Sequence, residues 1–173
     1  MKAFILGILS TIIFFYSGHG QVKEASQNLK TQAEKMGASF VLKDFKTFAS
    51  FTYPLIVKSM GGASKMIEVL NRTTNEMNDK GMKFNKISFD TPSQIVKSKN
   101  ELQATIPQIK EIKLPKGRLV STSTLIAISI DNGQNWTFID TSNKNLTSLR
   151  KAFPNLSPAI NIPPQQPPIR YSN

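Results

Sequence analysis

The spacing of hydrophobic residues changes near residue 82, from a helical period to a strand period. Segment 40–60 carries its apolar residues, among them Phe45 and Phe48, every three or four positions. This spacing predicts an amphipathic helix. Pro54 is expected to kink or split that helix near Tyr53, because a proline ring removes a helical hydrogen bond and clashes with the preceding turn.

A second helix is predicted in ASKMIEVLNRTTNEMNDKG, after the glycine pair that ends the first. Met66 and Met77 share its apolar face, Ser64 is the expected N-cap and Gly81 the expected C′ residue. The preceding segment, residues 21–39, is polar and rich in Lys, Gln and Ser. It is predicted to be a loose polar leader with a helical turn at most.

From residue 82 the apolar residues alternate, which predicts strands. MKFNKISFD slips phase once, indicating a bulge, and SQIVKS is a short strand turned by Lys99-Asn100. ELQATIPQIKEIKLP is interrupted at Pro107, which favours an edge or a bulge. RLVSTSTLIAISI becomes apolar on both faces and predicts a central strand covered by helix on one side, with QNWTFID as its antiparallel partner. A short helix is expected over 145–153.

This order predicts an α+β fold: N-terminal helices packed on a curved antiparallel sheet of about five strands, with a short C-terminal helix. One domain is expected over 40–157, followed by a proline-rich extended tail over 158–173. A long kinked helix lying in a curved sheet resembles the cystatin-like and nuclear-transport-factor-2-like cones. That resemblance implies an architecture only.

The first twenty residues have the pattern of a secretory signal peptide. Lys2 precedes an apolar run that is shorter than the roughly 20 residues of a spanning helix. Gly18 and Gly20 then stand at −3 and −1 of a cleavage site before Gln21. No cysteine is present for a lipid anchor. We therefore expect a secreted or periplasmic protein with no transmembrane helix after cleavage.

The residue types that are missing exclude several mechanisms. The chain has no cysteine, and its one histidine, His19, lies in the predicted signal peptide. A thiol nucleophile, a Ser-His-Asp relay and a zinc site of imidazole or thiolate ligands are therefore excluded. No cofactor and no metal are expected. Carboxylates, Lys, Tyr, Ser and Thr remain for chemistry.

The chain is strongly basic, with 22 Lys and Arg against 11 Asp and Glu and a formal net charge of +11. Such a field attracts polyanions. The lysines, however, are scattered singly or in loose pairs, and no specific nucleic-acid motif is present. Polyanion binding and an ordinary solvated basic surface both remain open.

One motif stands out, SIDNGQNWTFID. Its pattern Ser-x-Asp-x-Gly-x-x-Trp resembles the Asp-box of sialidases and other β-propeller proteins. Those proteins carry several copies, whereas this chain has one and is too short for a propeller. The motif predicts a structural hairpin in which Ser129 and Asp131 accept turn N–H groups, Gly133 supplies a positive φ and Trp136 packs beneath.

Four residues are candidates for lining a ligand cavity. Asp90 and Asp140 each follow an apolar strand, and a glycosidase needs two such carboxylates roughly 5 to 10 Å apart. Both aspartates are equally good turn or cap residues. Tyr53 and Trp136 are amphipathic aromatics that suit either a pocket wall or the core.

Five short phrases of the chain form a set: Tyr53-Pro54, Met60-Gly61-Gly62, Pro115-Lys116-Gly117-Arg118-Leu119, Ile126-Ala127-Ile128-Ser129, and Asp131-Asn132-Gly133 to Asp140. Together they resemble a set of uncharacterised secreted proteins and lipoproteins of Bacteroidetes. The resemblance implies a small exported bacterial domain and brings no known activity and no known site residues.

The sequence favours a non-enzymatic binding or envelope-associated module whose partner is an anionic envelope component or a small ligand. Two alternatives stay open. One is a carboxylate-based hydrolase or isomerase acting in a cone cavity, and the other is a binder of polyanions such as acidic glycans or nucleic acid.

Overall fold

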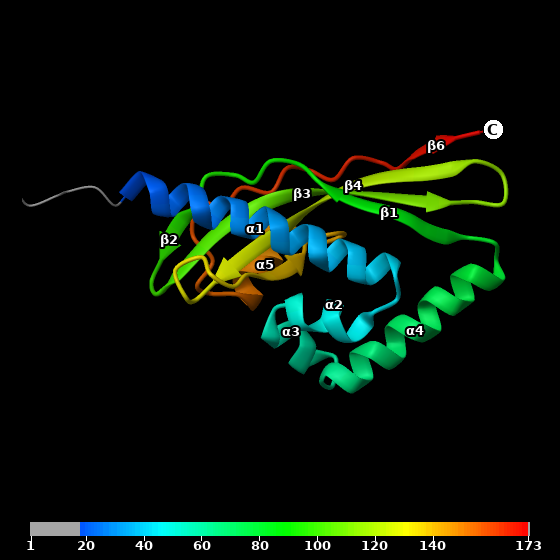
Figure 1. Cartoon of the computed structure of the whole chain (residues 1–173), viewed down its shortest axis with the longest axis horizontal. Coiled ribbons are helices and arrows are strands. Elements are labelled where there is room, and N and C mark those ends of the chain that lie inside the picture. The colour runs from blue at the N-terminus through cyan, green and yellow to red at the C-terminus, as the bar shows by residue number, and fades with distance from the viewer. Residues whose placement is uncertain (1–17, 173) are drawn as a thin grey trace, which may run out of the picture.

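The predicted α+β class is confirmed in a computed structural model, which describes residues 18–172. Helices come first, followed by a curled antiparallel sheet of six strands and a short helix (Figure 1). Residues 1–17, which carry most of the predicted signal peptide, lie outside the described part. The helices are α1 (Gly18–Val41), α2 (Phe45–Phe51), α3 (Pro54–Ser59), α4 (Ala63–Asp79) and α5 (Leu146–Ala152). The strands are β1 (Lys83–Phe89), β2 (Val96–Ser98), β3 (Glu101–Lys113), β4 (Arg118–Ser129), β5 (Thr137–Asp140) and β6 (Ile169–Tyr171).

The prediction of a loose leader over 21–39 is wrong, because these residues lie in α1, a helix of 24 residues. Ala25, Leu29, Ala33 and Met36 are buried at steps of four and three and belong to the core. Two of these residues are alanines, which bury little surface, so the apolar stripe is narrow. Packing against the sheet stabilises this helix more than its own amphipathicity does.

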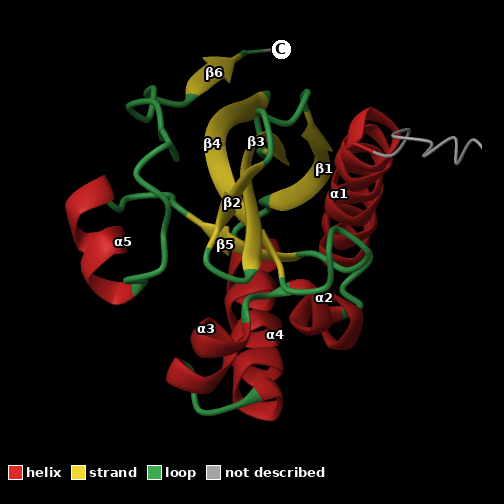
Figure 2. Ribbon diagram, turned by 90° about the vertical axis from the view of Figure 1, so that its left-hand side faces the viewer, coloured by secondary structure: helices red, strands yellow, loops and turns green. Residues whose placement is uncertain are grey.

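α1 also approaches β1 closely, and Figures 1 and 2 both show the two elements side by side. The approach depends on Gly37, which is inside the helix. A Cβ added to Gly37 would lie 2.8 Å from Phe89 Cε2 and 3.0 Å from Ile87 Cγ2. The glycine therefore marks a helix–strand contact and not the end of a leader.

The helix expected over 40–60 is divided at two places, not one. The split near Tyr53 is confirmed, with Pro54 in the first turn of α3. The earlier break was not expected. There Lys43 has a φ of 60°, and the Asp44 carboxylate accepts a hydrogen bond from Thr47 N at 3.1 Å, which caps α2.

The helix expected in ASKMIEVLNRTTNEMNDKG is present as α4 (Ala63–Asp79), although its N-cap is Gly62 and not Ser64. Gly62 adopts a φ of 94°, and the helix is followed by Gly81 at a φ of 70°. The expectation that Gly81 terminates this helix is thus confirmed.

The sheet has the strand order β1-β3-β4-β5, with β2 paired to β3 and β6 paired to β4. Every pair is antiparallel. The predicted bulge in β1 lies between Phe84 and Lys86. β3 and β4 pair continuously from Leu102 opposite Ser129 to Lys113 opposite Arg118. This long hairpin is the centre of the sheet, and every other strand pairs with β3 or β4.

Pro107 does not interrupt β3 or place it at an edge, as the sequence suggested. β3 is an inner strand, and Pro107 lies opposite Thr124 within the β3–β4 ladder. The Pro107 carbonyl accepts a hydrogen bond from Asp90 N, just beyond the end of β1. The N and C=O of one strand residue point to the same side, so the Pro107 nitrogen, which carries no hydrogen, also faces β1 and not β4. The β3–β4 ladder therefore loses no hydrogen bond.

β4 is apolar on both faces, as predicted, and both faces are covered. Leu125 and Ala127 face a front core shared with α1, whereas Ile126 and Ile128 face a rear core shared with α5. Figure 2 shows α1 and α5 on opposite sides of the sheet. The expectation of helix on one side only was therefore too narrow.

The proline-rich tail returns to the sheet. Most of residues 158–168 have no regular structure, and β6 then pairs with β4, with Arg118 opposite Tyr171 and Val120 opposite Ile169.

Candidate functional site

The Asp-box hairpin is held by its own polar groups. Gly133 N donates to Ser129 Oγ at 2.9 Å, and Ser129 Oγ donates to Asp131 Oδ1 at 2.8 Å. The Asp131 carboxylate also accepts from Asn135 N at 2.9 Å and Asn135 Nδ2 at 2.7 Å. Burial opposes ionisation of Asp131, but the bonds from Asn135 and Ser129 hold its pKa below the ordinary value. The motif acts as the predicted hairpin.

Trp136, one of the four cavity candidates, is part of the core. Its side chain is 1% exposed, and its Nε1 donates to the Gly133 carbonyl at 3.1 Å. Gln32 of α1 hydrogen-bonds to this turn at two places. Its Nε2 donates to Gln134 O at 2.7 Å, and its Oε1 accepts from Trp136 N at 2.8 Å. The Trp136 ring is therefore buried and both of its N–H groups are already hydrogen-bonded within the protein, so Trp136 does not line a ligand cavity.

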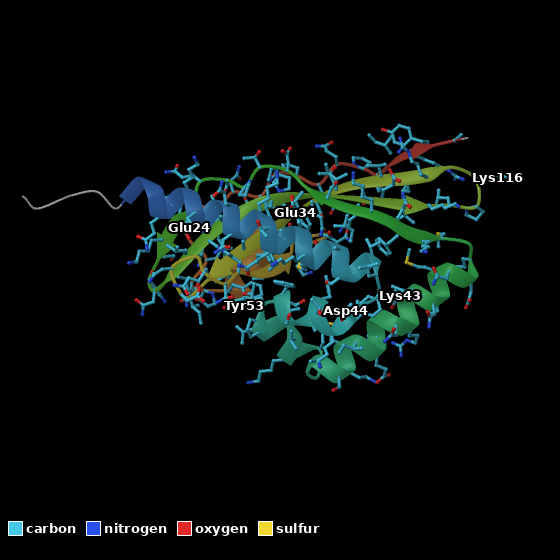
Figure 3. All side chains as sticks on the ribbon, in the orientation of Figure 1. Glu24, Glu34, Lys43, Asp44, Tyr53 and Lys116 are labelled. Atoms are coloured by element: carbon cyan, nitrogen blue, oxygen red, sulfur yellow. The ribbon has the colours of Figure 1, made fainter. Side chains whose placement is uncertain are left out.

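Tyr53 lies on the rear side of the sheet and packs edge-on against Phe153, with ring centroids 5.6 Å apart. Figure 3 labels it close to α3. It borders a crevice of about 90 Å³ together with Glu101 and Leu156, among others. Burial, and then the charge of Glu101, raises the pKa of the Tyr53 hydroxyl. This crevice is too small for a substrate.

Asp140 ends β5, and its side chain is 46% exposed. Lys110 Nζ lies 3.2 Å from its Oδ2, while Ser142 N and Oγ donate to its Oδ1 at 2.8 and 2.6 Å. Burial alone would raise the pKa of Asp140, but the Lys110 charge and the Ser142 bonds hold it below the ordinary value. Asp140 is thus an ionised carboxylate in a turn.

The structure does not bring Asp90 and Asp140 together. Asp90 is exposed, and its backbone N–H donates to the Pro107 carbonyl. Pro107 lies opposite Thr124. Thr124 O in turn accepts from Thr141 N, the residue after Asp140. The two aspartates are therefore three strand spacings apart, about 14 Å, and alternation places them on opposite faces. This geometry does not fit a glycosidase pair.

A front pocket of about 170 Å³ lies where the helices meet the sheet. Its walls are mostly apolar, and Asp140 and Lys144 supply charges. Gln108 is the buried polar group there, and its Oε1 accepts from Ser123 Oγ at 3.3 Å. The pocket is lined by Met36, Phe48, Thr52, Ile56, Met66, Gln108, Leu125, Phe138, Asp140 and Lys144.

A larger cavity, the rear groove, has a volume of about 450 Å³. It lies between the sheet and the tail, and hydroxyl and amide side chains are prominent in its lining. This site was not predicted from the sequence, although the run Ser-Thr-Ser-Thr in an apolar strand and the doubled prolines of the tail are signals that could have indicated it. The groove is lined by Pro107, Thr122, Ser123, Thr124, Thr141, Ser142, Lys144, Asn145, Leu146, Ile162, Pro163, Pro164, Gln165 and Gln166.

The rear groove opens on an uncovered edge of β4. On the edge of β4 that faces away from β3, β5 pairs with residues 125–128 and β6 with 118–120, so on this edge no strand of the described chain pairs with 121–123. Pro167 and Pro168 precede β6 and lack the N–H that would extend its ladder. The Thr124 carbonyl points to this open edge, where it accepts a hydrogen bond from Thr141 N. The N–H and C=O of Thr122, two residues earlier, therefore point to the same edge.

Within residues 18–172 no group of three or more His, Cys, Asp or Glu is placed to hold a metal ion. The helices of that same span include none with the length and hydropathy needed to cross a membrane.

Comparison of the chain with protein-family models, with curated proteins and with solved structures gives no match. The function therefore has to be inferred from the sites themselves.

Proposed function

We propose that this protein is a non-enzymatic binding module, exported to a bacterial envelope, and that the rear groove is its ligand site. The observation that carries the proposal is a groove of about 450 Å³ over a stretch of strand edge that the described chain leaves unpaired. Small-molecule sites commonly have volumes of 300 to 1,000 Å³, which the front pocket and the crevice at Tyr53 do not reach. A hollow of about 540 Å³ beside α2 and α3 does reach it, but it is a shallow depression open to solvent and has no unpaired strand edge among the described residues.

The lining indicates a polar ligand with a negative charge. The hydroxyl groups of Thr122 and Thr124 and the amide of Gln166 can exchange hydrogen bonds with a polyhydroxylated molecule. Lys144 supplies the positive charge. Leu146 and neighbouring prolines offer apolar surface. An acidic sugar combines these features, and it is the ligand class we propose.

The arrangement of carboxylates favours binding over the hydrolase alternative. Asp90 and Asp140 do not share a cavity, and the lowered pKa of Asp140 makes it a poor proton donor near neutral pH. For export, the support is the N-terminal pattern of Lys2, apolar run and small residues. Cleavage before Gln21 leaves the buried positions of α1 from Ala25 onward intact.

Titration of the isotope-labelled protein with glucuronate, followed by NMR, tests the proposal. We expect shifts of the Thr122, Thr124 and Gln166 amides, and weaker shifts with uncharged glucose. Lys144→Gln is expected to weaken glucuronate binding about tenfold. Lys97→Gln, at an exposed position on β2, is the matched control and is expected to have no effect.

Two results would contradict the proposal. One is the absence of shifts in the groove with acidic sugars while the protein is folded, and the other is turnover of such a sugar. Export is tested separately, by mass spectrometry of the protein recovered from the periplasm or medium of expressing cells. A mature N-terminus at Gln21 is expected, and retention of intact protein in the cytoplasm contradicts it.

A further inference from the structure

The far end of the sheet carries positive charges in register. Lys83 lies opposite Lys113, Lys113 opposite Arg118, and Arg118 opposite Tyr171. Directly opposed side chains share a face, with Cβ atoms about 4.5–5.5 Å apart, and like charges in this position destabilise a sheet. The row therefore disfavours folding locally, and a role in binding an anion would explain it.

Further cations surround this row. Lys86 follows on β1, opposite Glu111, and Lys116 is at the tip of the β3–β4 hairpin (Figure 3). The carboxylate within the patch, Glu111, accepts hydrogen bonds from Asn85 Nδ2 at 2.6 Å and Arg118 Nη1 at 2.8 Å. Glu111 offsets part of the charge of Arg118 and of Lys86, and the one carboxylate is outnumbered by the cations around it, so the face keeps a positive field.

The same face exposes apolar side chains. Ile169 lies opposite Val120, one alternate position from Tyr171, and Ile109 lies opposite Thr122. Ile169 is 57% exposed and Tyr171 43%. The Arg118 guanidinium stacks over the Tyr171 ring, 4.8 Å from its centroid. Exposed isoleucine and tyrosine among lysines are typical of surfaces that meet lipid, where apolar groups enter the headgroup boundary and cations bind anionic headgroups.

We propose that this distal face docks on an anionic lipid surface. The face is defined by Lys83, Lys86, Ile109, Lys113, Arg118, Ile169 and Tyr171. A soluble polyanion would use the cations but would gain little from Ile109 and Ile169. The inference goes beyond the rear groove and does not depend on it, since none of these residues lines that groove.

Co-sedimentation of the full chain with lipid vesicles tests the inference. We expect binding to vesicles of equal parts phosphatidylglycerol and phosphatidylcholine, weakening as salt is added. Vesicles of phosphatidylcholine alone measure any contribution from the apolar N-terminal run. The double variant Lys83→Gln, Lys113→Gln is expected to bind the anionic vesicles about 25-fold more weakly, at about fivefold for each cation removed.

The matched control is the double variant Lys35→Gln, Lys46→Gln. It removes the same charge from exposed positions on α1 and α2, and less than a twofold change is expected. Equal losses in the two double variants would show that net charge alone drives binding and would overturn the proposal.

The apolar contribution is tested with Ile169→Ser and Ile109→Ser. Each is expected to reduce vesicle binding several-fold without changing retention on heparin. The two positions lie on different strands, so loosening of β6 in the first variant does not affect the second. Heparin retention without vesicle binding, or full vesicle binding by both serine variants, would overturn the lipid assignment.

Discussion

The two halves of the β3–β4 hairpin share one continuous register but have opposite surroundings. In the proximal half, residues 102–106 lie opposite 125–129 and are largely buried, between α1 in front and α5 behind. In the distal half, residues 109–113 lie opposite 118–122 and include exposed cations and exposed Ile109. The same ladder thus supports a core at one end and an exposed, charged surface at the other.

This contrast indicates where stability is concentrated. The proximal half is closed even at its polar positions, because Gln103, fully buried, donates from Nε2 to Asn155 O at 3.0 Å and accepts from Ser157 N at 2.8 Å. The distal half has the tail strand β6 at its edge, and every residue of β6 is exposed. Substitutions in the distal half should alter binding with little loss of folding free energy.

The largest expected effect is in the proximal core. Trp136→Ala removes a side chain that is 1% exposed, and the free energy of unfolding is expected to fall by about 3–5 kcal/mol. Tyr171→Ala, on β6 at the edge of the distal half, should change it by less than about 0.5 kcal/mol. Urea denaturation followed by circular dichroism measures both. Comparable losses at the two positions would refute the division of the hairpin.

The Asp-box turn comes next. Gly133→Val places a Cβ 2.5 Å from Ala25 Cβ at a φ of 86°, and Asp131→Ala leaves several turn donors without their acceptor. Each is expected to lower the free energy of unfolding by about 1–3 kcal/mol. Asn132→Gly, at a φ of 59°, is the control and should be nearly neutral. A loss of ligand binding with an unchanged melting temperature would contradict this structural role.

A smaller effect is expected at Asp140, where the proximal and distal halves meet. Its pKa is lowered in the folded protein, so its stabilising contribution is present above its unfolded pKa, about 3.9. That contribution is lost as the pH falls through the folded pKa. Asp140→Asn should lower the free energy of unfolding at pH 7 by less than about 1 kcal/mol, because the carboxylate is half exposed.

Denaturation of wild type and the Asp140→Asn variant across pH 2–7 checks this expectation. The difference between the two proteins should shrink on acidification below about pH 4. A difference that stays constant with pH would show that the ion pair with Lys110 is not its source.

The smallest effect has the opposite sign. Lys83→Gln with Lys113→Gln relieves the repulsion between directly opposed cations, and the free energy of unfolding is expected to rise by about 0.2–1 kcal/mol. The same double variant should lose vesicle binding. Thermal melts and co-sedimentation on one preparation measure both properties. A destabilised variant would show that the two lysines support the fold.

Much of the sheet and α4 could be predicted from the sequence, because their signals are local. Alternation of apolar residues indicated β1 and its bulge, a continuous apolar run indicated that both faces of β4 are buried, and the motif around Gly133 indicated the hairpin. α1 could not be recognised in this way. Its buried positions include Ala25 and Ala33, which hardly differ in hydropathy from their polar neighbours. The break at Lys43 was missed for a related reason, since the apolar stripe continues across it through Phe45.

The candidate sites were less accessible from the sequence. Trp136 and Asp140 were singled out correctly as residues of an ordered turn and a strand end, but their partners Gln32 and Lys110 are distant in the chain. The rear groove and the distal face depend on the register of β4 with β5 and β6. The pattern of apolar and polar residues within one segment cannot predict that register, because it depends on two segments that are distant in the chain.

The sequence by itself determined the α+β class, the period of most strands, the hairpin at Asp131 and the absence of thiol and imidazole chemistry outside the first twenty residues. These are properties of local spacing and composition. Only the tertiary structure decided that residues 21–39 form a core helix, that Asp90 and Asp140 lie apart, and that three cations align across strands. Those outcomes depend on packing and register, in which residues far apart in the chain become neighbours.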